Sequence, residues 1–183
     1  MQTYISILRG INVSGHKQIK MADLKVLYEG LKFKDVSTYI QSGNIVFKAA
    51  STSDTEISAK IGQAILKKYQ FEVPVIIRTA QEMETIYAAN PFINQKDIDQ
   101  EKLHVTFLAR MPEQVNLDKI ENLSYASDQF TLLNREVYLY CPGGYGNTKL
   151  SNTFFENKLK VTATTRNWKT VTKLIAIADQ ISG

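Results

Sequence analysis

The chain has 183 residues, 44% of them hydrophobic and 22% charged, a composition that is ordinary for a globular protein. This length accommodates one large domain or two small ones. No apolar run approaches the ~18–20 residues that span a bilayer, and the start, MQTYISILRG, lacks the basic region of a signal peptide. The single cysteine, Cys141, excludes an internal disulfide. A cytoplasmic protein without a membrane partner is therefore expected. The net charge of +4 permits nucleic acid as a partner but does not require it.

Alternating strand and helix periodicities run through the first half of the chain. Strands are expected at Thr3–Leu8, Val36–Ile40, Asn44–Phe47 and Val73–Ile77, and helices at Met21–Leu31 and Asp54–Tyr69. Asp54 is expected to cap the second helix, and Gln41-Ser42-Gly43 to form a tight hairpin turn. The order strand–helix–strand–strand–helix–strand is the split βαβ pattern of a ferredoxin-like fold.

The second half of the chain repeats this pattern imperfectly. Helices are expected at Ala80–Ala89, Pro112–Leu123, Asn152–Leu159 and Asn167–Gln180, and strands at His104–Ala109, Asp128–Leu133 and Glu136–Tyr140. The polar segment Ile93–Lys102 is expected to be a linker or an exposed loop, and the half is expected to end in helix without a fourth strand. The sequence therefore predicts an α+β fold of two packed ferredoxin-like subdomains with antiparallel sheets. These are residues 1–79 and residues 80–183, the second with two C-terminal helices.

Acidic residues are missing from four stretches that are rich in Gly, Asn, Thr and base. These acid-free stretches are Arg9–Lys20, Tyr39–Phe47, Tyr138–Thr153 and Val161–Lys173. They contain seven of the 22 Lys and Arg residues, and the rest of the chain has 15 bases against 18 acids. The whole positive excess therefore lies in these stretches. If they meet in space, they form a positive, amide-rich cleft, which is a natural anion site.

Two glycine-containing loops supply candidate anion-binding groups. The loop Arg9–Gly15 follows the first strand, and its glycines permit left-handed backbone and the close approach of a ligand. The loop Gly143–Lys149 resembles a phosphate loop in composition only, because Thr148 stands before Lys149 where a Walker loop needs Gly. A simple turn in the first case and a flexible connection in the second are the alternatives. Near the last helix, Thr165 is expected to be the N-cap, which would leave Arg166 and the first-turn amides facing outward.

Four other side chains could have either a functional or a structural role. Cys141 could be a nucleophile, but no His or acid is near it in sequence, so a buried thiol is favoured. His16 could act as an acid or base or be a solvated loop residue, and His104 fits a structural role in a strand. Trp168 could be a core anchor or a stacking platform for a base. With no carboxylate in the acid-free stretches, no protein-held metal is expected.

Four motifs make the chain similar to the bacterial domain of unknown function 1697 family over essentially its whole length. They are LRGINVSGHKQIKM (Leu8–Met21), TYIQSGNIVF (Thr38–Phe47), YLYCPGGYGNTKLSNTFFENKL (Tyr138–Leu159) and ATTRNW (Ala163–Trp168). The resemblance implies an α+β fold like two packed ferredoxin-like subdomains, and it implies no catalytic role for any residue. The characteristic positions of the family coincide with Arg9, Gly10, Asn12, Gly15, Lys17, Gln41, Ser42, Gly43, Asn44, Gly144, Tyr145, Thr148, Lys149, Asn152, Arg166, Asn167 and Trp168.

The favoured function is binding of a small phosphorylated or nucleotide-like anion. The expected ligand-binding residues are Arg9, Gly10, Asn12, Gly15, Lys17, Ser42, Asn44, Gly144, Tyr145, Thr148, Lys149, Arg166 and Asn167, with Arg9, Gly144, Lys149 and Arg166 lining one cleft. The alternatives are a nucleic-acid-binding module and a structural or partner-binding protein without catalysis. Aromatic residues at Tyr39, Phe47, Tyr138 and Tyr140 could stack on bases, although no RNP-type run is present. Catalytic activity, any cofactor and the oligomeric state stay open.

Overall fold

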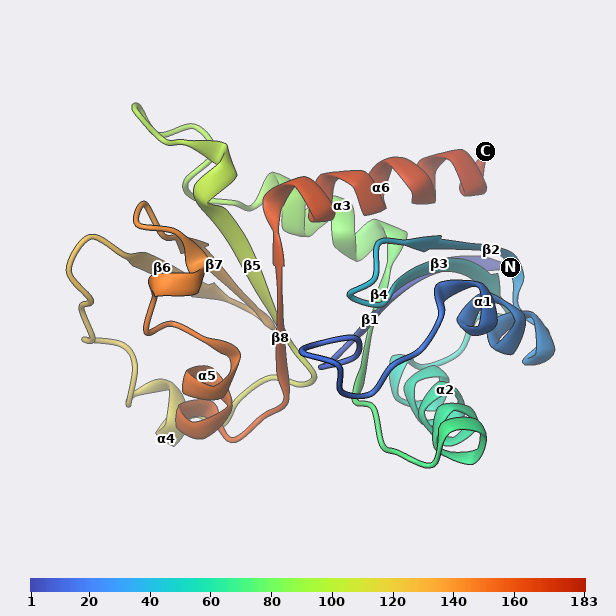
Figure 1. The fold of residues 1–183 in the computed structure, drawn as a ribbon. Helices are drawn as coiled ribbons and strands as arrows, with labels where there is room; N and C mark the ends of the chain where they lie inside the picture. The colour runs from blue at the N-terminus through green and yellow to red at the C-terminus, as the bar shows by residue number, and fades with distance from the viewer. The chain divides into compact units, whose positions relative to one another are not determined.

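The computed structural model describes residues 1–183, which divide into two compact units. The first unit comprises Met1–Thr85 and Lys173–Gly183, and the second is Ile86–Thr172. Each unit contains one four-stranded antiparallel sheet (Figure 1), so the predicted α+β class with two antiparallel sheets is confirmed. The helices α3 (Ala80–Ala88) and α6 (Trp168–Ser182) contain the boundaries between the units.

The first unit has the element order βαββαβ. Its elements are β1 (Gln2–Leu8), α1 (Met21–Gly30), β2 (Lys34–Tyr39), β3 (Asn44–Ala49), α2 (Asp54–Tyr69) and β4 (Val75–Thr79). The strand order is β2-β3-β1-β4, and every neighbouring pair is antiparallel. Alternation along β1 directs Tyr4 and Leu8 to the face that α1 and α2 cover, where they join Leu24 and Ile61 in one core.

The second unit repeats this order and topology. Its elements are β5 (Leu103–Leu108), α4 (Gln114–Leu117), β6 (Gln129–Leu133), β7 (Glu136–Tyr140), α5 (Asn152–Leu159) and β8 (Ala163–Asn167). The strand order β6-β7-β5-β8 matches that of the first sheet, again with antiparallel neighbours. Leu108, Val137 and Leu139 of the sheet pack with Phe155 and Leu159 of α5 to form its core.

The second unit has a fourth strand, β8, which the sequence analysis did not predict. This strand pairs with β5 from His104↔Asn167 to Leu108↔Ala163. Its residues Ala163–Asn167 are mostly polar, so they lack the apolar alternation by which the other strands were recognised. The threonines are nevertheless β-branched, which suits strand backbone.

The length of one helix and the N-cap of another also differ from expectation. The predicted helix Pro112–Leu123 is reduced to α4, because Ile120 and Leu123 donate their N–H groups to the carbonyls three residues earlier, as in successive turns. This spacing still directs both side chains inward and imitates a helical period. The N-cap of α2 is Ser53, whose hydroxyl accepts a hydrogen bond from Glu56 N–H, rather than Asp54.

Candidate functional site

The side chain of Asn12 stabilises the acid-free stretch Arg9–Lys20, which connects β1 to α1, through hydrogen bonds to the backbone. Its Nδ2 donates to the carbonyls of Ile19 (3.0 Å) and Gln41 (2.8 Å), and its Oδ1 accepts from Ile19 N–H (2.8 Å). The backbone of Asn12 is left-handed, with φ of 54°, a conformation that Asn tolerates better than most residues. These bonds use both polar atoms of the carboxamide to hold the loop in place.

The tip of this loop is an exposed turn. His16 N–H donates to Val13 O (2.9 Å) around Ser14 and Gly15, which both have positive φ (49° and 78°). Lys17 is also exposed, and its Nζ donates to the Glu72 carbonyl (2.6 Å). The N–H groups of Ser14 and Gly15 make no hydrogen bond within the protein. The tip therefore offers amide donors beside a lysine.

The turn between β2 and β3 packs closely against this loop. Gly43 has φ of 84°, and a Cβ there would lie 2.7 Å from Ile11 Cδ1 and 2.8 Å from Leu8 Cβ, so no side chain fits. Asn44 is buried, and its Nδ2 donates to Tyr39 O and Ser42 Oγ (both 3.0 Å). Asn44 therefore holds the turn from inside, with Ser42 as one of its acceptors.

The glycine loop Gly143–Lys149 follows β7 in the second unit. Gly144 adopts φ of 91°, and its N–H donates to Cys141 O (2.9 Å). Thr148 Oγ1 donates to Asp128 Oδ2 (2.5 Å), so a carboxylate from outside the acid-free stretches fixes this loop. The N–H groups of Gly143, Gly146 and Lys149 make no hydrogen bond within the protein. The loop thus keeps three amide donors and an exposed lysine.

His104 lies between the glycine loop and the end of β8. It stands opposite Asn167 in the ladder of β5 and β8, and its ring stacks on Tyr145 with centroids 4.8 Å apart and planes at 23°. Its Nδ1 is 3.3 Å from Lys102 O, and because a carbonyl only accepts, Nδ1 carries the hydrogen and Nε2 is an acceptor. Burial lowers the pKa of His104 from its ordinary value. The imidazole is therefore mainly neutral at pH 7.

Asn167 caps α6, where Thr165 was the expected N-cap. Thr170 N–H donates to Asn167 Oδ1 (2.8 Å), whereas Thr165 Oγ1 donates to Asn152 Oδ1 (2.6 Å). The longer strand explains the difference, because Thr165 lies inside β8 and Asn167 at its end. The N–H groups of Trp168 and Lys169 make no hydrogen bond within the protein. Because Asn167 stands opposite His104 in the ladder, the N-terminus of α6 lies at the same end of the sheet as His104.

Arg166 is buried, with 8% of its surface exposed, although it was expected to face outward. It belongs to β8, and its Nη1 donates to Thr164 Oγ1 (3.0 Å) and Thr165 O (2.9 Å). Arg78 holds the matching position in β4 of the first unit, is also buried, and donates to Ile77 O (2.8 Å). Both arginines are thus built into strands rather than displayed at a helix end.

The structure favours a structural role for both Cys141 and Trp168. Cys141 is fully buried, and burial raises the pKa of its thiol, which disfavours a nucleophile. Trp168 is 3% exposed and stacks on Tyr87 with centroids 5.1 Å apart. Phe47 and Tyr138 are also buried, so neither ring forms an exposed platform for bases.

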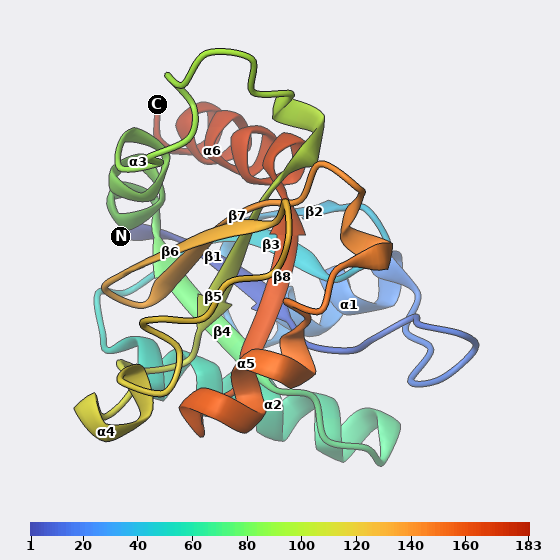
Figure 2. The same cartoon turned by 90° about the vertical axis from the view of Figure 1, so that its left-hand side faces the viewer.

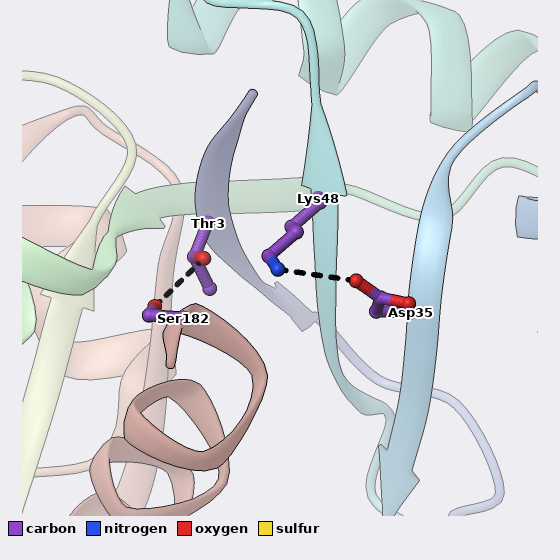
Figure 3. A network of polar contacts seen from close by, with 4 residues as sticks. All are labelled: Thr3, Asp35, Lys48 and Ser182. Carbon is purple, nitrogen blue, oxygen red and sulfur yellow. Dashed lines mark hydrogen bonds and ion pairs between the residues drawn. The ribbon is translucent and has the colours of Figure 1, made fainter.

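A polar cavity of about 720 Å³ in the first unit was not found from the sequence. Lys34 and Lys48 line it from neighbouring strands, where they face each other in the ladder. Figure 3 shows two of its polar contacts, between Lys48 Nζ and Asp35 Oδ2 (3.2 Å) and between Thr3 Oγ1 and Ser182 Oγ (2.9 Å). The sequence contains little signal for it, because Lys34 and Lys48 lie just outside the predicted strands Val36–Ile40 and Asn44–Phe47.

The predicted ligand residues form one group in each unit. The first unit contains Arg9, Gly10, Asn12, Gly15, Lys17, Ser42 and Asn44, and the second contains Gly144, Tyr145, Thr148, Lys149, Arg166 and Asn167. Within the second unit, His104 connects Tyr145 to Asn167. The expectation that Arg9, Gly144, Lys149 and Arg166 line one cleft stays a prediction. No group of three or more His, Cys, Asp or Glu side chains is placed to hold a metal ion, and no helix has the length and apolar character to cross a membrane.

These features describe an α+β protein with two units of the same topology and basic, glycine-containing loops. The sequence profile of the family described as protein of unknown function (DUF1697) matches residues 1–138, so the chain belongs to the DUF1697 family. No curated protein matches it. Among solved structures, it is similar to the conserved bacterial protein SP0830 from Streptococcus pneumoniae, with a TM-score of 0.75 and 22% identity over 97% of this chain and 98% of that one. At this identity the likeness shows the fold alone.

Proposed function

We propose that the protein binds a small phosphorylated or nucleotide-like anion at the end of the second sheet, beside His104. The observation that carries the proposal is the position of His104, which stacks on Tyr145 of the glycine loop and stands opposite Asn167, the N-cap of α6. Two sets of amide N–H groups without a hydrogen bond therefore lie near this end of the unit, one in the glycine loop and one in the first turn of α6. Such donors at a helix N-terminus and in a glycine loop favour phosphate.

Exposed lysines add charge to these donors. Lys149 ends the glycine loop and Lys169 lies in the first turn of α6, and both side chains are exposed. Neutral His104 contributes an acceptor, Nε2, which suits a hydroxyl or amino group of the ligand more than its phosphate. A phosphorylated sugar or nucleotide has both kinds of group.

The stretch Arg9–Lys20 is proposed as an anion-binding element of the first unit by the same physics. The amides of Ser14 and Gly15 and the exposed Lys17 carry this part of the proposal. Asn12, Ser42 and Asn44 would then act by holding the loops in shape, since their side chains already bond within the protein.

Nucleic-acid binding is the less supported alternative. A ferredoxin-like sheet that binds single strands presents exposed aromatic rings on its central strands. Phe47 and Tyr138 are buried, and Tyr138 donates its hydroxyl hydrogen to Ile86 O (2.8 Å). The rings with partial exposure are Tyr39 and Tyr140.

A thermal-shift screen tests the proposal with matched pairs of compounds. Each nucleotide or sugar phosphate is compared with its nucleoside or free sugar, so that the phosphate is the one difference. A phosphorylated ligand at about 100 times its dissociation constant should stabilise the fold by roughly 2.7 kcal/mol, while its unphosphorylated partner should have little effect. Equal shifts within every pair, or no shift with any compound, would contradict the proposal.

A further inference from the structure

The strand β6 is an unprotected edge of the second sheet. It is the terminal strand in the order β6-β7-β5-β8 (Figure 2), and it pairs on one side, with β7, in an uninterrupted register. Alternate residues of such a strand direct N–H and C=O groups away from the sheet, where another strand can bind them. The sequence of β6, QFTLL, has no charge and no proline to prevent this.

The corresponding edge of the first sheet is protected. The strand β2 occupies the position in sheet 1 that β6 occupies in sheet 2. It begins with Lys34 and Asp35, its register shifts between Lys34 and Ser37, and Asp35 has φ of 51°. Charges and bulges are the usual means of preventing strand addition. Of the two equivalent edge strands, β2 is therefore protected against strand addition, whereas β6 is not.

An apolar groove of about 340 Å³ lies beside β6. Leu117 and Ile120 line one wall, and Phe130 and Leu132 of β6 line the other. An added strand would place alternate side chains on the groove side of the sheet. The open edge and the groove therefore suit one extended segment with apolar residues at alternate positions.

The segment Glu113–Glu121, which supplies four of the residues that line this groove, is acidic in a protein that is basic as a whole, and we call it the acidic rim. Between Glu113 and Glu121 the chain has three acids against one base, Lys119. Lys119 Nζ is engaged with Asn116 Oδ1 (2.6 Å), whereas Glu121 lines the groove and has no partner within the protein. Charge complementarity therefore favours a segment with Lys or Arg beside its apolar residues.

We infer that β6 and its groove bind an extended, basic–apolar segment of a partner protein by β-strand addition. Main-chain hydrogen bonds to the β6 edge supply affinity, the groove selects apolar side chains, and the acidic rim selects flanking bases. The residues that line the groove include neither His104 nor any residue of the glycine loop, and the inference does not depend on anion binding.

A labelled peptide tests the inference. The probe is fluorescein-labelled Lys-Leu-Thr-Leu-Thr-Leu-Lys, titrated with the full chain by fluorescence anisotropy, and the complex is mapped by hydrogen exchange. Saturable binding is expected, together with slower exchange in Gln129–Leu133 and unchanged exchange in Lys34–Tyr39, the protected edge. A peptide with both Thr replaced by Pro should bind at least about tenfold more weakly, because Pro cannot donate to the ladder.

Charge variants separate the rim from general electrostatics. Glu121→Lys should weaken binding of the basic probe about two- to five-fold, whereas Glu72→Lys, an exposed glutamate of the first unit, should not. The inference fails if the proline peptide binds equally well, if protection lies outside β6, or if there is no saturable binding up to about 1 mM. Dimerisation of the chain that protects Gln129–Leu133 without peptide would also overturn it, because the edge would then belong to a second copy.

Discussion

Gly43 and Gly144 both have positive φ, but their surroundings differ. A Cβ at Gly43 would collide with Ile11 and Leu8, while a Cβ at Gly144 would have nothing within 4 Å. Gly144→Ala should therefore cost about 1–2 kcal/mol from backbone strain alone. Gly43→Ala adds overpacking and should cost about 2–5 kcal/mol. Urea unfolding of both variants measures the difference, and equal losses would show that packing at Gly43 is not limiting.

The imidazole of His104 should make the stability of the protein depend on pH. Because burial lowers its pKa in the folded state, the unfolded chain binds the proton more tightly. Its contribution is fully present above the ordinary pKa of about 6.5 and is lost as the pH falls below that value. His104→Gln should flatten the fall in unfolding free energy between about pH 7 and pH 5.5. His16→Gln, at an exposed position, is the matched control variant.

The residue types in the sequence located the loops correctly, but they did not predict the role of each side chain within them. The glycines at positions 10, 15, 43 and 144 all have positive φ, as their type suggests. By contrast, Asn12, Asn44 and Thr148 use their polar atoms within the protein, and Arg166 is buried. Whether a polar atom faces a ligand or a neighbouring carbonyl depends on contacts distant in sequence, so residue type alone could not decide it.

Elements with a clear apolar period were the easiest to predict. The helix Asn152–Leu159 and the strand Glu136–Tyr140 have their expected bounds. Burial of Phe155 and Leu159 follows the helical period, whereas the strand is a short run that is buried along most of its length. The strand β8 was missed because its inward residues include threonines that bond to neighbours, as Thr106 and Thr165 do (2.7 Å). Strand pairing stabilises such a segment, and a single sequence does not reveal the pairing.

The stretch Arg9–Lys20 should depend on Asn12 for its shape. Asn12→Ala removes three hydrogen bonds, one of which joins the loop to the turn at Gln41. A loss of about 2–3 kcal/mol in unfolding free energy is expected, since each bond contributes roughly 0.5–1.5 kcal/mol. Asn94→Ala, at an exposed site without such bonds, should stay within about 0.5 kcal/mol of the unmodified protein. A loss below about 1 kcal/mol for Asn12→Ala would show that the loop holds its shape without this side chain.

The whole molecule consists of two units with the same topology and different surfaces. Both sheets place a buried arginine in the last strand, Arg78 in one and Arg166 in the other, followed by a helix capped by Thr79 or Asn167. The cap and the arginine are therefore part of the repeated scaffold. Differences between the units, such as the glycine loop after β7 and the open edge of β6, are the better candidates for function.

Anion binding by the glycine loop is tested most directly by comparing affinity with stability in one variant. Lys149→Ala is titrated calorimetrically with the phosphorylated compound that gives the largest thermal shift, and its unfolding is measured in urea. Because the side chain is exposed, stability should change by less than about 1 kcal/mol, while affinity should fall roughly ten- to a hundred-fold. Lys96→Ala, another exposed lysine of the second unit, should change neither quantity. If Lys149→Ala instead keeps its affinity and loses stability, Lys149 is a structural residue and this loop does not hold the anion.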